Sequence, residues 1–160
     1  MAPELSPSLA LSIAFALALS VSMLVKFWLA TRQMRHVAAH RGAVPAPFAQ
    51  RISLQAHQRA ADYTLAKGRF GLLTMAFGAA VLLGWTLLGG LDTLNVALRD
   101  ALQPRLGDMA YQLALLAAFA LIGGLIDLPL ELYSTFRIEQ QFGFNRMTWR
   151  LYLIDMLKGM

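Results

Sequence analysis

Residues 5–25 read LSPSLALSIAFALALSVSMLV, 21 consecutive residues without Asp, Glu, Lys or Arg. As an α-helix with ~1.5 Å rise per residue, this run would be about 31 Å long, which matches the roughly 30 Å hydrocarbon core of a bilayer. A cleaved signal peptide is the competing interpretation, but its basic residues precede its apolar stretch. Here Glu4 precedes the run, and Lys26 and Arg32 follow it. The sequence therefore predicts an uncleaved first membrane helix over about residues 5–29.

Two further runs without charged residues follow. They are FGLLTMAFGAAVLLGWTLLGGL at residues 70–91 and MAYQLALLAAFALIGGLI at residues 109–126. The second of these is at the short end for a membrane helix, so it is expected to continue past Asp127. We predict spans over about residues 68–91 and 109–130. Because an ionisable group costs roughly 2.5–3.5 kcal/mol at the bilayer centre and less near the interface, Asp127 is interpreted as marking the cytoplasmic end of the third helix. A cavity-facing role is the alternative.

The composition of the whole chain agrees with a membrane protein. Of the 160 residues 58% are apolar and only 14% are charged. A soluble domain of this size buries about 70% of its unfolded surface, so much of this apolar surplus would face water. The absence of cysteine excludes disulfides, thiolate catalysis and Cys-ligated metal sites. The predicted fold class is an all-α membrane protein with three transmembrane helices plus cytoplasmic interfacial helices.

The distribution of Lys and Arg predicts the orientation. The first connection, residues 31–67, and the tail, residues 131–160, are rich in basic residues, whereas Arg99 and Arg105 of the second connection are offset by three Asp. The positive-inside rule places the N-terminus outside and the C-terminus in the cytoplasm. The net charge of +5 is then explained by anionic lipid beside the spans. Membrane lipid is the expected partner, and nucleic acid is not.

The first connection is expected to contain an amphipathic helix that begins near Pro47 and leads into the second span. Apolar residues recur there at steps of three or four, which is typical of an interfacial helix. The residues of this stripe are Phe48, Ile52, Ala56, Ala60 and Tyr63.

Three histidines, His36, His40 and His57, are candidate metal ligands. His36 and His40 are four residues apart and could face one zinc ion, but a zinc-protease helix needs Glu where Val37 stands. A third ligand is not evident. We therefore interpret both as part of a solvated basic stretch and His57 as a surface residue, and we assign no metal ligand.

The tail contains the most specific stretch, FRIEQQFGFNRMT at residues 136–148. Gly143 and Asn145 tolerate left-handed backbone, and Thr148 can cap a new helix that begins at Trp149. The sequence predicts a helix, a break lined by aromatic residues and a second helix. A nucleophile with its base, a metal cluster and a phosphate loop are all lacking, so no catalytic residue is assigned.

This tail resembles the N-terminal signature of the CAAX prenyl endopeptidases, which are integral-membrane zinc metalloproteases. The residues that match it, here taken as structural, are Phe136, Glu139, Phe142, Gly143, Phe144, Asn145 and Thr148, with Leu128-Pro129 before them and Asp155 and Lys158 after them. The first connection resembles the family as well, at His40-Arg41, Val44-Pro45, Phe48, His57-Gln58, residues 60–64 and Ala66-Lys67.

The resemblance implies that several membrane helices enclose a chamber. It also implies that a later His-Glu-x-x-His helix and a further Glu bind zinc, and that the bound water cleaves a peptide near a prenylated C-terminus. This sequence has no His-Glu-x-x-His motif. We expect residues 1–160 to be the N-terminal membrane region, truncated before the catalytic part, inactive alone and partnered by that missing region. Zinc is expected only in the complete enzyme, so hydrolysis by this chain alone is expected to be nil. Whether the chain is part of an enzyme stays open.

The alternative is a non-enzymatic membrane scaffold or a transport or assembly subunit, since helices with Gly-rich faces could oligomerise. The excess of Arg over Lys, with much Ala, Leu and Gly, favours a bacterial inner membrane. Substrate identity, oligomeric state and whether the chain is a natural truncation are not determined by the sequence.

Overall fold

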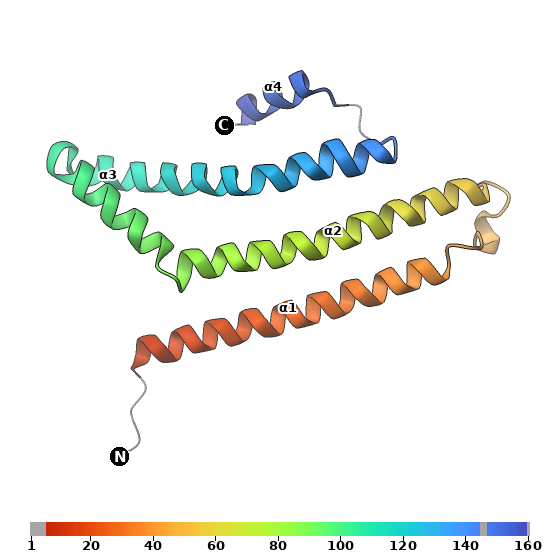
Figure 1. The fold of residues 1–160 in the computed structure, drawn as a ribbon, viewed down its shortest axis with the longest axis horizontal. Coiled ribbons are helices and arrows are strands. Elements are labelled where there is room, and N and C mark those ends of the chain that lie inside the picture. Colours follow the sequence, from red (N-terminus) through yellow and green to blue (C-terminus); the bar gives the residue numbers. More distant parts are fainter. Residues whose placement is uncertain (1–5, 145–146, 160) are drawn as a thin grey trace, which may run out of the picture.

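A computed structural model describes residues 6–144 and 147–159, and this part of the chain is built from long helices that run alongside one another (Figure 1). Within it, three helices are long and apolar enough to cross a membrane, which confirms the predicted fold class. The elements in chain order are α1 (Pro7–Ala39), the 3₁₀ turn η1 (Ala46–Phe48), α2 (Leu54–Thr86), α3 (Gly90–Tyr133), the π-helix η2 (Ser134–Glu139) and α4 (Trp149–Gly159).

α1 begins at a capped end and runs well past the uncharged run. The Ser6 hydroxyl accepts a hydrogen bond from the Leu9 amide at 3.3 Å, and proline at the first helical position costs no hydrogen bond. The helix packs along α2 so closely that a Cβ added to Gly68 would lie 2.8 Å from the Met34 sulfur. The absence of a side chain at Gly68 therefore sets how near the two helices approach.

α2 begins at Leu54, so the prediction of a helix start near Pro47 is wrong. Ser53 has extended backbone and its hydroxyl accepts from the Ala56 amide at 3.2 Å, which is an N-cap. Pro47 lies in the short turn η1 instead. The expected amphipathic helix and the second apolar run as far as Thr86 form one continuous helix, and Phe48 and Ile52 lie outside it. As a helix, the predicted span to residue 91 is too long, because the chain turns between Leu87 and Gly89.

α3 combines the second connection with the third apolar run. Gly107 has φ 80° and ψ 177°, and the helix folds back there, so its first part diverges from the second in Figure 1. The connection before Gly107 is therefore helical. The helix also runs through Asp127 and Pro129 to Tyr133. The interpretation of Asp127 as the end of a helix is wrong, because the backbone stays helical across the proline.

Few side chains are shielded from solvent by the protein itself. In the described residues the buried ones are Ala61, Ile138 and Tyr152, whereas apolar residues of all three long helices are open, such as Leu24 at 70% and Leu116 at 67%. A water-soluble protein rarely exposes so continuous an apolar surface. Lipid is the solvent that these helices fit.

Candidate functional site

The predicted break in the tail is a structured elbow, which we define as residues 134–144. η2 continues α3 as a π-helix. This form is rare in proteins overall, but where it occurs it is often at a functional site. The chain then leaves the helix at Gly143, whose φ is 78°. The Gly143 amide donates to the Gln140 carbonyl at 3.1 Å and the Phe144 amide to the Glu139 carbonyl at 2.9 Å, which is the Schellman pattern of helix ends. The predicted left-handed glycine is confirmed.

Two aromatic residues of the elbow, Phe142 and Phe144, pack on one residue of α2. The Tyr63 ring lies edge-on to Phe142, with centroids 5.4 Å apart, and tilted against Phe144 at 4.6 Å. Such pairs add about 0.5–1.5 kcal/mol beyond the area they bury. The aromatic residues Phe142 and Phe144 of the tail motif therefore pack against α2.

An ion pair joins the same two elements. The Lys67 ammonium donates to the Glu139 carboxylate at 2.9 Å and to the Ser134 hydroxyl at 3.1 Å. Ser134 and Glu139 are the first and last residues of η2. One side chain of α2 thus bridges the two ends of the π-helix.

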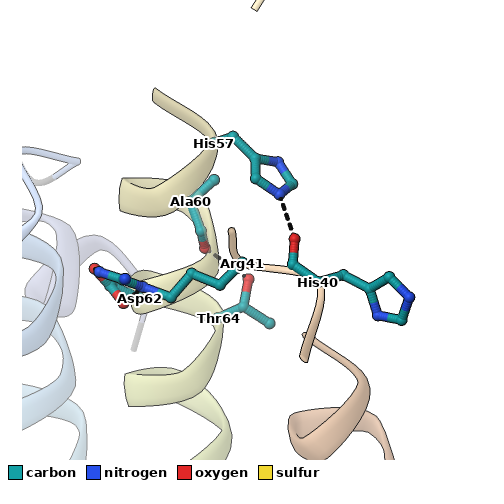
Figure 2. Close-up of polar contacts among 6 residues, drawn as sticks. All are labelled: His40, Arg41, His57, Ala60, Asp62 and Thr64. Atoms are coloured by element: carbon teal, nitrogen blue, oxygen red, sulfur yellow. Dashed lines mark hydrogen bonds and ion pairs between the residues drawn. The ribbon is translucent and has the colours of Figure 1, made fainter. Parts of the chain in front are cut away.

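A second set of polar contacts closes the first connection (Figure 2). The Arg41 guanidinium donates to both carboxylate oxygens of Asp62, at 2.6 and 2.8 Å, and these hydrogen bonds lower the pKa of Asp62. The His57 ring donates from Nε2 to the His40 carbonyl at 3.0 Å. Together they tie the end of α1 to the start of α2.

The histidines are engaged with backbone. His40 Nδ1 donates to the His36 carbonyl at 2.8 Å, and the two rings lie 4.2 Å apart. His57 is half-buried and closes the loop described above. In the part of the chain that the structure describes, no group of three or more His, Cys, Asp or Glu is placed to hold a metal ion.

A groove of about 800 Å³ lies between α3 and α4, beside the elbow. Its apolar side is formed by α3 residues such as Leu121 and Leu125, and carboxylates of Glu131, Glu139 and Asp155 line its polar side. The groove can accept an apolar group at one end and a cationic or hydrogen-bonding group at the other.

α4 is capped as the sequence indicates, and it packs against the elbow. The Thr148 hydroxyl accepts from the Leu151 amide at 3.3 Å, which confirms Thr148 as its cap. Tyr152 lies edge-on to Phe136, with centroids 5.6 Å apart. Burial, followed by the charge of Glu131, raises the pKa of Tyr152. Asn145 lies outside the described residues.

Sequence reasoning missed the partners of this motif. Lys67 continues the helical stripe through Ala56, Ala60 and Tyr63 by one more step of four, so the face was detectable. A pattern defined only by apolar residues ends at Tyr63, so it does not include Lys67. The π-helix left no comparable signal.

Fold and site together define a polytopic helical membrane protein in which, among the described residues, the polar side-chain contacts between different elements lie at one end of the bundle. The family model described as "CAAX prenyl protease N-terminal, five membrane helices" matches residues 33–160. The chain therefore belongs to the CAAX prenyl protease family and corresponds to its N-terminal membrane region.

Individual relatives agree with this assignment. CAAX prenyl protease 1 of Saccharomyces cerevisiae is 26% identical over 140 residues, which cover 83% of this chain and 30% of the yeast protein. The homolog from Oryza sativa subsp. japonica is 30% identical over 135 residues, 78% of this chain and 30% of the rice protein. The chain thus spans about a third or less of these relatives.

A crystal structure of S. mikatae Ste24p has the same fold, with a TM-score of 0.78. The match covers 89% of this chain and 33% of that one at 24% identity.

Proposed function

We propose that this chain supplies part of the chamber wall and the docking surface for the catalytic region of a zinc metalloendopeptidase of the CAAX prenyl protease type. The observation that carries the proposal is the elbow. A break that is merely a loose end needs no π-helix, no left-handed glycine and no ion pair to a lysine 72 residues earlier in the chain.

The groove beside the elbow is the proposed inner face of this wall. Its apolar side lies on the part of α3 that we propose crosses the membrane, about residues 109–130. Its carboxylates lie at the polar end of that span. In the complete protein this face would look into the chamber. The other proposed spans are about residues 5–29 and 68–91, with residues 31–67 and 131–160 in the cytoplasm.

Orientation and location are part of the proposal. The excess of basic residues in the first connection and the tail supports a cytoplasmic C-terminus. The composition supports a bacterial inner membrane, although the named relatives are eukaryotic.

Zinc chemistry is assigned to the complete enzyme and not to this chain. The sequence has no His-Glu-x-x-His motif, and the described residues do not form a ligand set. A bound zinc would supply an activated water where three ligands and a base are present. The role left to this chain is to bind, orient and enclose.

A chimera tests the proposal. The matched N-terminal segment of the yeast relative is replaced by this chain, and cleavage of a prenylated C-terminal peptide is measured with and without a chelator. We expect chelator-sensitive cleavage by the chimera and none by the 160-residue chain. A folded, zinc-loaded chimera that leaves the peptide intact contradicts the docking role, and chelator-sensitive cleavage by the chain alone contradicts the division of labour.

A further inference from the structure

One face of α1 carries an apolar stretch that turns cationic within three helical turns. Its residues line a hollow of about 440 Å³. They lie at steps of three or four along the helix, so they share one side of it. We call this set the α1 stripe, and it consists of Leu24, Phe27, Trp28, Thr31, Arg32 and Arg35.

The α1 stripe lies where the helix leaves the hydrocarbon. The uncharged run ends at Val25, and Arg35 follows about 15 Å further along the helix. Tryptophan and arginine are enriched at this depth, because an amphipathic ring and a long cationic chain both fit the headgroup layer. The stripe therefore spans the boundary between acyl chains and headgroups.

Four side chains of the stripe are exposed, those of Leu24, Trp28, Arg32 and Arg35, whereas Phe27 and Thr31 are half-buried. Leu24 is 70% exposed and Trp28 is 60% exposed in the described structure, and α2 packs on another side of α1, at Met34. The Arg32 guanidinium lies 5.5 Å from the centroid of the Trp28 ring, a cation–π arrangement that holds it over the hollow. Its planar donors match the oxygens of a phosphate.

We propose that the α1 stripe is a binding site for one anionic phospholipid. Arg32 and Arg35 would hold the headgroup phosphate, and Leu24, Phe27 and Trp28 would receive the acyl chains. A lipid fits better than a soluble phosphate because the apolar half of the hollow continues directly into the membrane run. The inference rests on the membrane placement of α1 and is independent of any proteolytic role.

Quenching of Trp28 fluorescence by brominated lipids tests the site. The Trp85→Phe/Trp149→Phe background leaves Trp28 as the single tryptophan. The 160-residue protein is reconstituted in phosphatidylcholine vesicles that contain either brominated phosphatidylglycerol or brominated phosphatidylcholine. We expect a preference for the anionic lipid of about fivefold per arginine, since each basic residue near an anionic surface contributes about that factor.

The matched variants separate a site from general attraction. Arg32→Gln/Arg35→Gln should remove the preference. Arg51→Gln/Arg59→Gln removes the same charge from two exposed arginines of the first connection and should keep the preference. Equal loss in both variants would overturn the proposal. Inorganic phosphate that erases the preference would also overturn it, in favour of a soluble anion. Equal quenching by both lipids would refute the site and leave the membrane placement intact. Quenching by neither lipid would overturn the proposal, because Trp28 would then be covered by protein or lie outside the bilayer.

Discussion

The two halves of α2 are stabilised in different ways. Residues 54–69 carry Asp62, Tyr63 and Lys67, and each contacts another element through a short polar or aromatic contact. Residues 70–86 expose large apolar side chains, among them Leu73 at 57%. The polar contacts of α2 with other parts of the chain therefore lie in the half outside the uncharged run. The other half contacts α3 through ring pairs, Phe70 with Tyr133 and Trp85 with Phe119.

The difference is the one expected if residues 68–91 span the bilayer, as proposed, because each half of α2 then lies in a different solvent. Beyond the hydrocarbon, water rewards the burial of apolar surface, and ion pairs can fix geometry. Within it, lipid tails are as apolar as the side chains, so helices associate through shape and small residues. The first half of α2 fixes the position of the elbow, and the second half exposes apolar side chains suited to lipid.

The largest effect is expected from Lys67→Glu. It removes two hydrogen bonds from an ammonium group and places a carboxylate against Glu139, so the elbow should lose on the order of 2 kcal/mol. SDS titration in mixed micelles, followed by tryptophan fluorescence, measures this loss. The swap Lys67→Glu/Glu139→Lys should recover most of it. A single variant as stable as the parent would show that the pair contributes nothing.

Gly143→Ala should destabilise the elbow by about 1.5 kcal/mol, because an L-residue pays roughly this much for left-handed backbone. Hydrogen exchange of the Gly143 and Phe144 amides should quicken along with the loss of stability. Gly42→Ala is the matched control, since nothing lies within 4 Å of its added Cβ and its φ is not positive. Equal effects of the two substitutions would contradict the Schellman closure.

The Arg41–Asp62 pair predicts a modest pH dependence of the first connection. Hydrogen bonds from Arg41 lower the pKa of Asp62 below its ordinary value of 3.8. The stabilisation is therefore complete above that value and is lost as the pH falls through the lower pKa of the folded state. Exchange protection of residues 40–53, corrected for intrinsic rates, should fall in this range and become flat in Asp62→Asn. A variant with an unchanged acid profile would assign the effect to another group.

In residues 70–86, Leu73→Ala should change stability in mixed micelles by less than about 0.5 kcal/mol, because the Leu73 side chain contacts the apolar solvent in both the folded and the unfolded state. The SDS titration used for Lys67→Glu measures it. A loss of about 2 kcal/mol or more, typical of a protein core, would mean that Leu73 faces protein and would weaken the contrast between the two halves.

Several elements could be predicted because they depend on local chemistry. The uncharged runs identify the long helices, and Gly143 and Thr148 have the roles their residue types favour at helix ends. The errors arose where one local signal competed with another. Ser53 is a better start for α2 than Pro47, and the helix tolerates Pro129 beyond Asp127.

The joint itself depends on residues far apart in the chain. Nothing near Lys67 indicates that its partner is Glu139, and nothing near Tyr63 indicates Phe142. These pairs form because α3 returns alongside α2 after the turn at Gly107 (Figure 1). The order of the motifs could be predicted from the sequence, whereas the contacts between them could be identified only from the fold.

The central claim is that α1, α2 and the second part of α3 cross the bilayer with the elbow at the cytoplasmic side. The chain has no cysteine, so single cysteines can be introduced at Gly42, Gln103 and Gln141 without background. A membrane-impermeant maleimide should label position 103 from outside intact cells and positions 42 and 141 only from the cytoplasmic side. Labelling of 103 and 141 from the same side would contradict the account.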